Sequence, residues 1–220
     1  MSYKDYINSL RLMDELTLSQ PNESEISKYS KSDIHWVRTK NNFSRKLSVK
    51  KGEIWQFEFG KNPIPEMAYE HRGLIIGVAN QILYVLPICS LKSHNQEHRN
   101  AYHFNDNPNS NSNFYLLKTS EIPFLKHDSV LKSNELKTIS TKRLLYKHGV
   151  LSCDSELFKS IERKSFYKCF PTFSFRFDRQ TEDIVNLTDR LNVLSENYNQ
   201  LQLDYKMLHQ EYTSLKNPNK

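Results

Sequence analysis

The most regular pattern of hydrophobic and polar positions lies near the C-terminal end of the chain. Apolar residues recur there at alternating spacings of three and four, without a slip, over residues 184–215. This heptad spacing is the signature of a coiled coil, and a steady period of 3.5 residues favours a rod over a helix packed in a globule. We therefore predict a coiled-coil helix over residues 181–216. Its apolar positions are Ile184, Leu187, Leu191, Leu194, Tyr198, Leu201, Tyr205, Leu208, Tyr212 and Leu215.

The partner of this predicted helix is weakly specified. Three successive a positions of the heptad carry tyrosine, which is bulky for a two-stranded core, and the flanking e and g positions carry few complementary charges. We favour self-association into a dimer or a higher oligomer. Packing against the chain's own N-terminal arm, or against a different protein, are the alternatives.

A β-rich segment is expected in the middle of the chain. All five glycines lie between residues 52 and 149, and glycine supplies the turns and bulges that small β folds need. The stretch "GEIWQFEFG" alternates like a strand. "RGLIIGVA" and "ILYVLPI" are apolar runs joined by Asn80 and Gln81, which predicts a buried hairpin. We predict a β domain over residues 50–165, followed by a linker over 166–180.

Further elements are expected in the second half of this domain. "FYLLKT" and "DSVLKSNELKTI" are strand candidates, whereas the polar residues 90–113 predict a long loop with a short strand at 101–104. "STKRLLYK" predicts a short helix that Ser140 or Thr141 caps. "LSCDSELFKSIERKSF" predicts a firmer helix with Ser152 as its cap. The apolar side of that helix consists of Leu157, Phe158 and Ile161.

Residues 1–49 are predicted to form a basic helical arm. The segment from Lys28 to Lys51 contains eight Lys and Arg residues but only one acidic residue, Asp33. Basic residues interleaved with aromatic residues suit a nucleic-acid strand, because cations pair with phosphates and rings stack on bases. A solvated helix face whose aromatic residues dock on the core is the alternative. The candidate RNA-binding residues are Trp36, Arg38, Lys40, Arg45, Lys46 and Lys51.

Composition narrows the class of protein. A hydrophobic content of 37% in 220 residues predicts a compact centre with polar arms. We expect no signal peptide and no membrane span, because no apolar run is long enough. The three cysteines lack CxxC spacing, which indicates a reducing, cytoplasmic environment. The net charge of +6 favours a polyanionic partner, although solubility alone would also account for it.

Two blocks within residues 50–163 resemble the MazF/PemK toxin family. "KKGEIWQFEFG", "HRGLIIGVANQ" and "VLPICS" are similar to the opening strands of the family, and "FLKHDSVLKSNELKTISTKRLLYKHGVLSCDSELFKSI" is similar to a second, more specific block. The resemblance implies an α+β fold with a small, strongly curved antiparallel SH3-like β-barrel, to which this chain adds an N-terminal helical arm and a long C-terminal coiled-coil helix. It also implies a homodimer and an antitoxin partner.

The activity that the resemblance implies is endonucleolytic cleavage of single-stranded RNA without a metal or other cofactor. The ribose 2′-hydroxyl attacks the adjacent phosphate and leaves a 2′,3′-cyclic phosphate. Arg72 stands at the position of the catalytic arginine of the family, and Cys89, with Ser90 beside it, stands at the position of a catalytic Thr or Ser. A guanidinium suits this chemistry, because its planar fork of donors can stabilise the charge that builds on the phosphorane.

Two departures from the family pattern concern the candidate catalytic residues. Gly73 replaces a proline, which would loosen the turn that aims Arg72, and Cys89 replaces the Thr, where a thiolate would be the better base. Alternatively, Cys89 is an inert core residue, and Arg72 forms an ion pair with Glu66 or Glu70.

A base for the 2′-hydroxyl is sought among the histidines. His94 and His98 lie in the loop after Cys89 and are the preferred candidates, whereas His71 would point to the opposite face from Arg72 in a regular strand. The i, i+4 spacing of His94 and His98 could hold zinc on a helix, but no Cys or carboxylate pair nearby completes the coordination of a metal ion. We expect no metal.

The sequence therefore predicts a cytoplasmic, toxin-like endoribonuclease. A catalytically degenerate module of the same fold, which binds nucleic acid and oligomerises, is the first alternative. A toxin that acts on a topoisomerase is the second.

Overall fold

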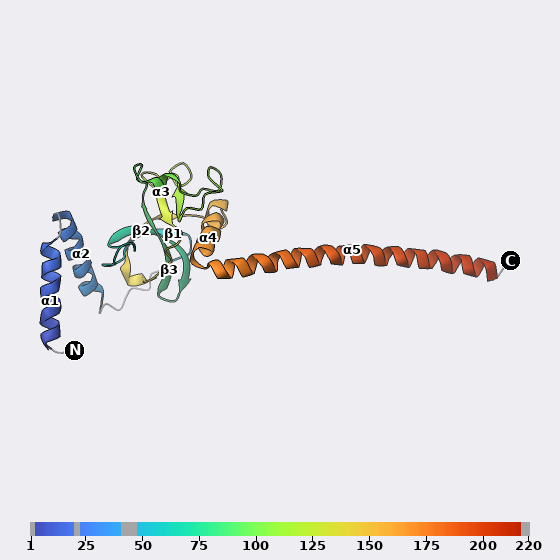
Figure 1. Cartoon of the computed structure of the whole chain (residues 1–220), viewed down its shortest axis with the longest axis horizontal. Coiled ribbons are helices and arrows are strands. Elements are labelled where there is room, and N and C mark those ends of the chain that lie inside the picture. The colour runs from blue at the N-terminus through green and yellow to red at the C-terminus, as the bar shows by residue number, and fades with distance from the viewer. Residues whose placement is uncertain (1–2, 20–22, 41–47, 217–220) are drawn as a thin grey trace. The chain divides into compact units, whose positions relative to one another are not determined.

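The computed structural model describes residues 3–19, 23–40 and 48–216. The chain divides into two compact units, Met1–Cys169 and Phe170–Lys220. The first unit contains every strand and the shorter helices, and the second is a long helix (Figure 1). None of the described helices combines the length and the apolar character that crossing a membrane requires.

The first unit is built on an antiparallel sheet of seven strands. The strands run in the order β4-β5-β3-β2-β1-β7, and β6 also pairs with β3. Their bounds are β1 Glu53–Glu58, β2 Glu70–Ala79, β3 Ile82–Ser90, β4 Phe114–Leu117, β5 Ser129–Lys132, β6 Lys137–Ser140 and β7 Leu144–Val150. The unit therefore combines an open antiparallel sheet with helices, in an α+β arrangement.

The predicted hairpin is confirmed as β2 and β3. Asn80 joins the two strands with a positive φ of 57°, a conformation that asparagine tolerates better than most residues and that tight hairpin turns require. Leu74, Ile75 and Leu86 are completely buried in the hairpin. The hairpin is thus the centre of the sheet, as its two apolar runs predicted.

One long edge of β3 is shared by two short strands. Ile88 to Ser90 pair with β5, whereas Ile82 to Val85 pair with β6. Pro87, which has no N–H to donate, lies where β3 changes partner. β5 and β6 therefore behave as one strand that is interrupted at residues 133–136.

The predicted closed barrel is not observed in the strand pairing of the described residues. The two end strands, β4 and β7, each pair along one side only, with β5 and β1 respectively. The loop between β4 and β5 packs against β7 instead. Ile122 and Leu125 of this loop are buried, and the ring of Phe124 lies against Gly149 of β7 so closely that a Cβ there would stand 2.5 Å from it.

Side chains on the two faces of the sheet form separate core clusters. The first cluster includes Ile54, Leu74, Ile88 and residues of the helix α4, Glu156–Cys169. The second cluster includes Phe57, Phe59, Met67, Ile75, Leu83, Val85 and Ile139. This division follows from strand geometry, because successive side chains point to opposite faces.

Two helix predictions need correction. The segment predicted as a short helix is a single turn, η1 Thr141–Arg143, capped by the Ser140 hydroxyl as expected, and it is followed by β7. Pairing with the open edge of β1 outweighs the local pattern. The longer helix α4 begins after Ser155, whose hydroxyl accepts from the N–H of Phe158 at 3.2 Å, so Ser155 caps it rather than Ser152.

The N-terminal arm contains two helices, α1 Tyr3–Leu18 and α2 Glu23–Lys40. The Ser32 hydroxyl of α2 donates to the buried carboxylate of Glu58 at 3.1 Å. Asp33 forms an ion pair with Lys61 at 2.7 Å. These contacts hold α2 near the end of β1.

The predicted linker over 166–180 is helical instead, apart from Phe170. Helix α4 ends at Cys169, and α5 runs from Pro171 to Lys216. Proline at the first position of α5 favours a new helix start, because its missing N–H costs nothing there. Figure 1 shows α5 as one continuous helix through the predicted coiled-coil segment.

Candidate active site

Arg72 lies on β2 at the margin of the first core cluster. It stands opposite Gln56 on β1 and Ile88 on β3, and residues directly opposite each other in a sheet share a face. Its side chain is half-buried. The apolar stem of the arginine is thereby covered by the sheet, while the guanidinium lies at the edge.

The guanidinium contacts two residues of the segment that leads into β5. Nη2 of Arg72 donates to Oγ of Ser129 at 3.1 Å and lies 3.3 Å from Nε2 of His127. The same Nε2 lies 2.8 Å from Oγ of Ser90 at the end of β3. We call Arg72, Ser90, His127 and Ser129 the Arg72 site.

Each member of the Arg72 site is placed by the pairing of β3 with β5. Ser90 stands opposite Ser129 in the register of the two strands. Ser129 is completely buried and donates to the backbone carbonyl of His127 at 3.0 Å. Ser90 and His127 are exposed, so a buried hydroxyl fixes the arginine while an exposed pair remains accessible to a ligand.

The contact with Arg72 indicates which nitrogen of His127 accepts a hydrogen bond. A guanidinium has only donors, so Nε2 of His127 is unprotonated in its contact with Arg72. The Ser90 hydroxyl, 2.8 Å from the same nitrogen, competes with Arg72 for its single lone pair. In the neutral ring the proton sits on Nδ1, and Nε2 is the atom that could take a proton from a substrate.

No carboxylate neutralises Arg72 among the described residues. Glu66, one of the two predicted ion-pair partners, pairs with Lys137 at 2.6 Å, and Glu70 is exposed. Burial lowers the pKa of Arg72 from its usual range, but an arginine remains charged in proteins. The site therefore presents a fixed positive charge with an unprotonated nitrogen beside it.

Cys89 is not brought to this site. It lies between Ile88 and Ser90 on β3, so its side chain points to the opposite face from Arg72. There it packs against the second core cluster. Burial raises the pKa of the Cys89 thiol, although Lys132, Lys92 and Arg72 act to lower it, so the predicted thiolate is not favoured. Ser90, not Cys89, lies on the same face of β3 as Ile88, which stands opposite Arg72.

The two histidines preferred from the sequence lie elsewhere. His98 is buried on the short helix α3, Gln96–Arg99, where its Nδ1 accepts from the N–H of Lys92 at 3.1 Å. Burial lowers the pKa of His98. His94 is exposed in the preceding turn. His71 borders a different pocket of about 310 Å³, together with Lys28, Lys31, Glu58, Tyr69 and Glu70.

The signal that could have found His127 and Ser129 was present in the sequence. Both lie in "KHDSV", inside the second block that resembles the toxin family, and His127 was one of the available histidines. The sequence does not connect them to Arg72, because 55 residues separate Arg72 from His127. Only the register between β3 and β5 brings them together, and no local pattern specifies that register.

The predicted RNA-binding residues are dispersed. Trp36, Arg38 and Lys40 are exposed on α2, where Nζ of Lys40 lies 4.6 Å from the centre of the Trp36 ring. Lys51 forms an ion pair with Glu162 at 2.6 Å. Arg45 and Lys46 lie outside the described residues. None of the three described α2 residues contributes a hydrogen bond to the Arg72 site.

An aromatic pair lies on β7, next to Gln56 on the face that carries Arg72. Tyr146 is opposite Gln56, and its ring centre lies 5.0 Å from that of His148. Tyr146 is 55% exposed. Nε2 of His148 lies 3.2 Å from Oε1 of Gln56, and burial, together with Arg72, lowers the pKa of His148.

The packing around position 73 explains why a glycine stands there. A Cβ at this position would stand 2.4 Å from a methyl group of Val85 and 3.0 Å from the ring of Phe57. Any larger residue would push these side chains of the second core cluster apart. Glycine at position 73 therefore fits this core, whereas a larger residue would not.

The part of the chain that the structure describes has no cluster of three or more His, Cys, Asp or Glu side chains that could hold a metal ion.

Comparison with known proteins gives distant similarities to solved structures only. No family model matches the sequence, and no curated protein matches it. Among solved structures, the chain is similar to an endoribonuclease in complex with its cognate antitoxin from Mycobacterial species, at 8% sequence identity and a TM-score of 0.35. The match covers 56% of this chain and 96% of that one. Similarity at this level does not establish a shared fold or activity.

Proposed function

We propose that the chain is a toxin-like endoribonuclease that cleaves single-stranded RNA without a metal ion. One observation carries the proposal: a fixed guanidinium with no carboxylate partner among the described residues contacts an accessible histidine–serine pair. A positive charge that faces a developing phosphorane and a nitrogen that can take a proton are the two groups that such a reaction needs.

In the proposed reaction, the substrate phosphate replaces the contact between Arg72 and His127. Nε2 of His127 takes the proton of the ribose 2′-hydroxyl, and O2′ attacks the adjacent phosphorus. The O2′–P bond forms, the P–O5′ bond breaks, and the leaving 5′-oxygen takes a proton from solvent. The products are a 2′,3′-cyclic phosphate and a 5′-hydroxyl. Arg72 binds two phosphate oxygens through its fork, and Ser90 donates to the phosphate.

The exposed ring of Tyr146 supports the assignment of single-stranded RNA as the substrate. Bases stack on accessible aromatic rings only when they are unpaired. Lys126 is also exposed, and its charge acts on His148 beside Tyr146. A nucleotide that flanks the cleaved bond would place its base on Tyr146 and its phosphate near Lys126.

The proposal includes a protein inhibitor as partner. The supply of a cofactor cannot limit the activity of a metal-independent ribonuclease, and its RNA substrate is present in the cytoplasm. An antitoxin that covers the Arg72 site would supply this restraint, and such a partner is also what the resemblance of residues 50–163 implies.

The test is to incubate the purified chain with a set of single-stranded RNAs in excess EDTA and to map the ends of the products. We expect cleavage that leaves 2′,3′-cyclic phosphate ends and that Arg72→Ala abolishes. Intact RNA across varied sequences, or equal cleavage by wild type and Arg72→Ala, contradicts the proposal.

Two outcomes of the same test would favour the alternatives. RNA binding without scission, with an affinity that falls steeply as salt rises, would indicate a binding module. Inhibition of a topoisomerase without RNA cleavage would indicate the second alternative.

A further inference from the structure

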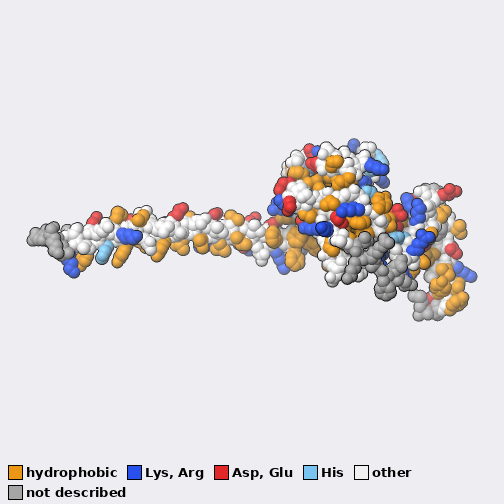
Figure 2. Space-filling model, turned by 180° about the vertical axis from the view of Figure 1, so that it is seen from behind, with side chains coloured by type: hydrophobic (Ala, Val, Ile, Leu, Met, Phe, Trp, Pro, Cys, Tyr) orange, Lys and Arg blue, Asp and Glu red, His pale blue; other side chains and the backbone are white. Residues whose placement is uncertain are grey.

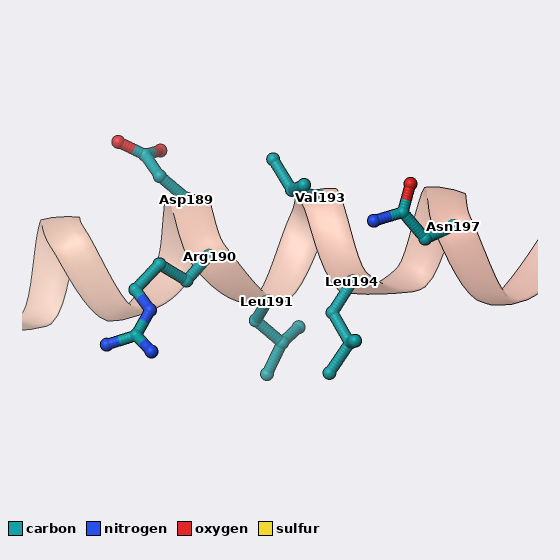
Figure 3. A pocket seen from close by; sticks show the side chains of 6 residues that line it. All are labelled: Asp189, Arg190, Leu191, Val193, Leu194 and Asn197. Carbon is teal, nitrogen blue, oxygen red and sulfur yellow. The ribbon is translucent and has the colours of Figure 1, made fainter.

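Helix α5 carries a continuous apolar stripe that nothing within its own unit covers. The nine described side chains of the heptad, from Ile184 to Tyr212, are between 59% and 69% exposed. Hydrophobic side chains recur along the whole length of the helix (Figure 2). In Figure 3, Leu191 and Leu194 project to one side of α5, and Asp189 and Val193 project to the other. A stripe of this length marks an interaction surface.

We propose that this stripe is the dimer interface of the protein, in which α5 pairs with α5 of a second copy as a parallel, in-register, two-stranded coiled coil. The inference does not depend on the proposed ribonuclease activity. It commits to a second copy because the residue types, the side-chain directions and the flanking charges of the stripe all fit an identical partner.

The residue types at the d positions and at the first a position favour two strands. Every d position is leucine, and the first a position is isoleucine. Leucine at d with a β-branched residue at a favours dimers, whereas isoleucine at d shifts the preference to trimers or tetramers. The d positions are Leu187, Leu194, Leu201, Leu208 and Leu215.

The tyrosines at a are accommodated by leaning toward the flank of the seam. The hydroxyl of Tyr198 accepts from Nε2 of Gln202, one turn further on at an e position, at 2.9 Å. The ring of Tyr205 is stacked on that of His209, again at an e position, with an interplanar angle of 12°. The polar tips thus lie at the edge of the seam, and the rings remain available to the partner.

The charges beside the seam favour the parallel orientation. In a parallel pair, each g residue faces the e residue of the partner five positions later. Asp204 then faces His209, and Glu211 faces Lys216, with no pair of like charges. In a fully overlapping antiparallel pair, g residues face g residues. Arg190 would then face Asp204, but Asp183 would face Glu211, which places two carboxylates together.

A pair of matched double variants tests the interface in the full-length chain. Leu194→Glu with Leu201→Glu places charges on the seam, whereas Val193→Glu with Leu203→Glu places the same charges on the outer face, at side chains that are 56% and 54% exposed. The measurement is the solution mass by sedimentation equilibrium, against 26.1 kDa for one chain.

We expect wild type and the outer-face variant to show the same association, and the seam variant to dissociate at least tenfold more readily. Equal masses for the two variants, or a monomeric wild type, would overturn the inference. Circular dichroism of the seam variant shows whether lost helix accompanies lost association, as expected when pairing stabilises a long helix.

Cysteine cross-linking tests the orientation and separates this interface from any contact between the first units. Leu208→Cys places two thiols opposite each other only in a parallel, in-register pair, because a disulfide requires Cα atoms within about 7 Å. Leu203→Cys on the outer face is the control. Peptide mapping distinguishes these links from those of Cys89, Cys153 and Cys169.

A disulfide between two copies of position 208, absent for position 203, is the expected result. Failure of Leu208→Cys to link overturns the parallel pairing. A mixture of Leu208→Cys and Leu191→Cys gives a second test. A disulfide that forms only between these two variants would also overturn the parallel pairing, because positions 208 and 191 meet in an antiparallel pair.

Discussion

The sheet of the first unit and helix α5 differ in how far their apolar side chains are buried. In the sheet, Leu74, Leu86 and Ile88 are completely buried by partners that lie far away in the sequence. In α5, Leu191 and Leu194 stay more than 60% exposed. The apolar side chains of the sheet are therefore buried within the chain, whereas those of α5 stay exposed within their own unit.

This difference predicts which changes affect which property. Residues of the Arg72 site control chemistry, and residues of the core clusters control the free energy of unfolding. The heptad residues of α5 control association.

Arg72→Ala should lower the rate of RNA cleavage by about a thousandfold, since lost electrostatic stabilisation of a transition state costs about 3–4 kcal/mol. Arg72→Lys should recover only part of the rate, because an ammonium lacks the planar fork. The measurement is single-turnover cleavage of a labelled RNA. A rate for Arg72→Lys equal to that of wild type would rule out the bidentate role.

His127→Gln should lower the cleavage rate by about a hundredfold, because glutamine cannot take the proton of the 2′-hydroxyl. His94→Gln is the matched control, since His94 is an equally accessible histidine outside the Arg72 site. The same single-turnover assay applies. A larger loss for His94→Gln than for His127→Gln would restore the prediction made from sequence.

Gly73→Ala should lower the free energy of unfolding by about 1–3 kcal/mol, the typical effect of overpacking a core. The added methyl would meet Val85 and Phe57. Urea denaturation monitored by circular dichroism gives the value. Gly77→Ala is the milder comparison, because its Cβ would approach the Tyr84 side chain no closer than 3.1 Å. An equal or larger cost at Gly77 would contradict this account of Gly73.

Stability should fall as the pH is lowered from 7 to 5. Burial lowers the pKa of His98, so the unfolded chain takes up a proton at this residue first, as the pH falls through about 6.5. The state that binds more protons is favoured by acid, and this state is the unfolded one. His98→Gln should therefore show a shallower decline in urea denaturation over this range. An unchanged slope would contradict the role of His98.

Cys89→Ala should leave the cleavage rate unchanged, because the thiol lies on the opposite face of β3 from Arg72. Ser90→Ala, one residue away, should reduce the rate. This neighbouring pair tests the face assignment directly in the cleavage assay, and the reverse order of effects would show that the assignment is wrong.

The elements that could be predicted from the sequence are those with a strong local period. The hairpin of β2 and β3, the buried face of α4 and the helical spacing of residues 184–215 follow from apolar repeats and a turn at Asn80. Strand β7 could not be predicted in this way. Its residues form a strand because β1 offers an open edge, which is a property of the folded sheet.

The candidate site was only half predictable, for the same physical reason. Arg72 and Ser90 lie on the hairpin whose pattern was clear, and strand alternation already places Ser90, not Cys89, on the face of Ile88. His127 and Ser129 enter through the pairing of β3 with β5. That pairing depends on long-range packing, which no single segment encodes.

The distance along the chain between the two halves of the site has a consequence for protein synthesis. A nascent polypeptide that has grown only as far as Lys126 carries Arg72 and Ser90, yet it has neither the imidazole nor the hydroxyl that contact the guanidinium. Whatever reaction this cluster performs, a ribosome must add the next strand before the chain can acquire it.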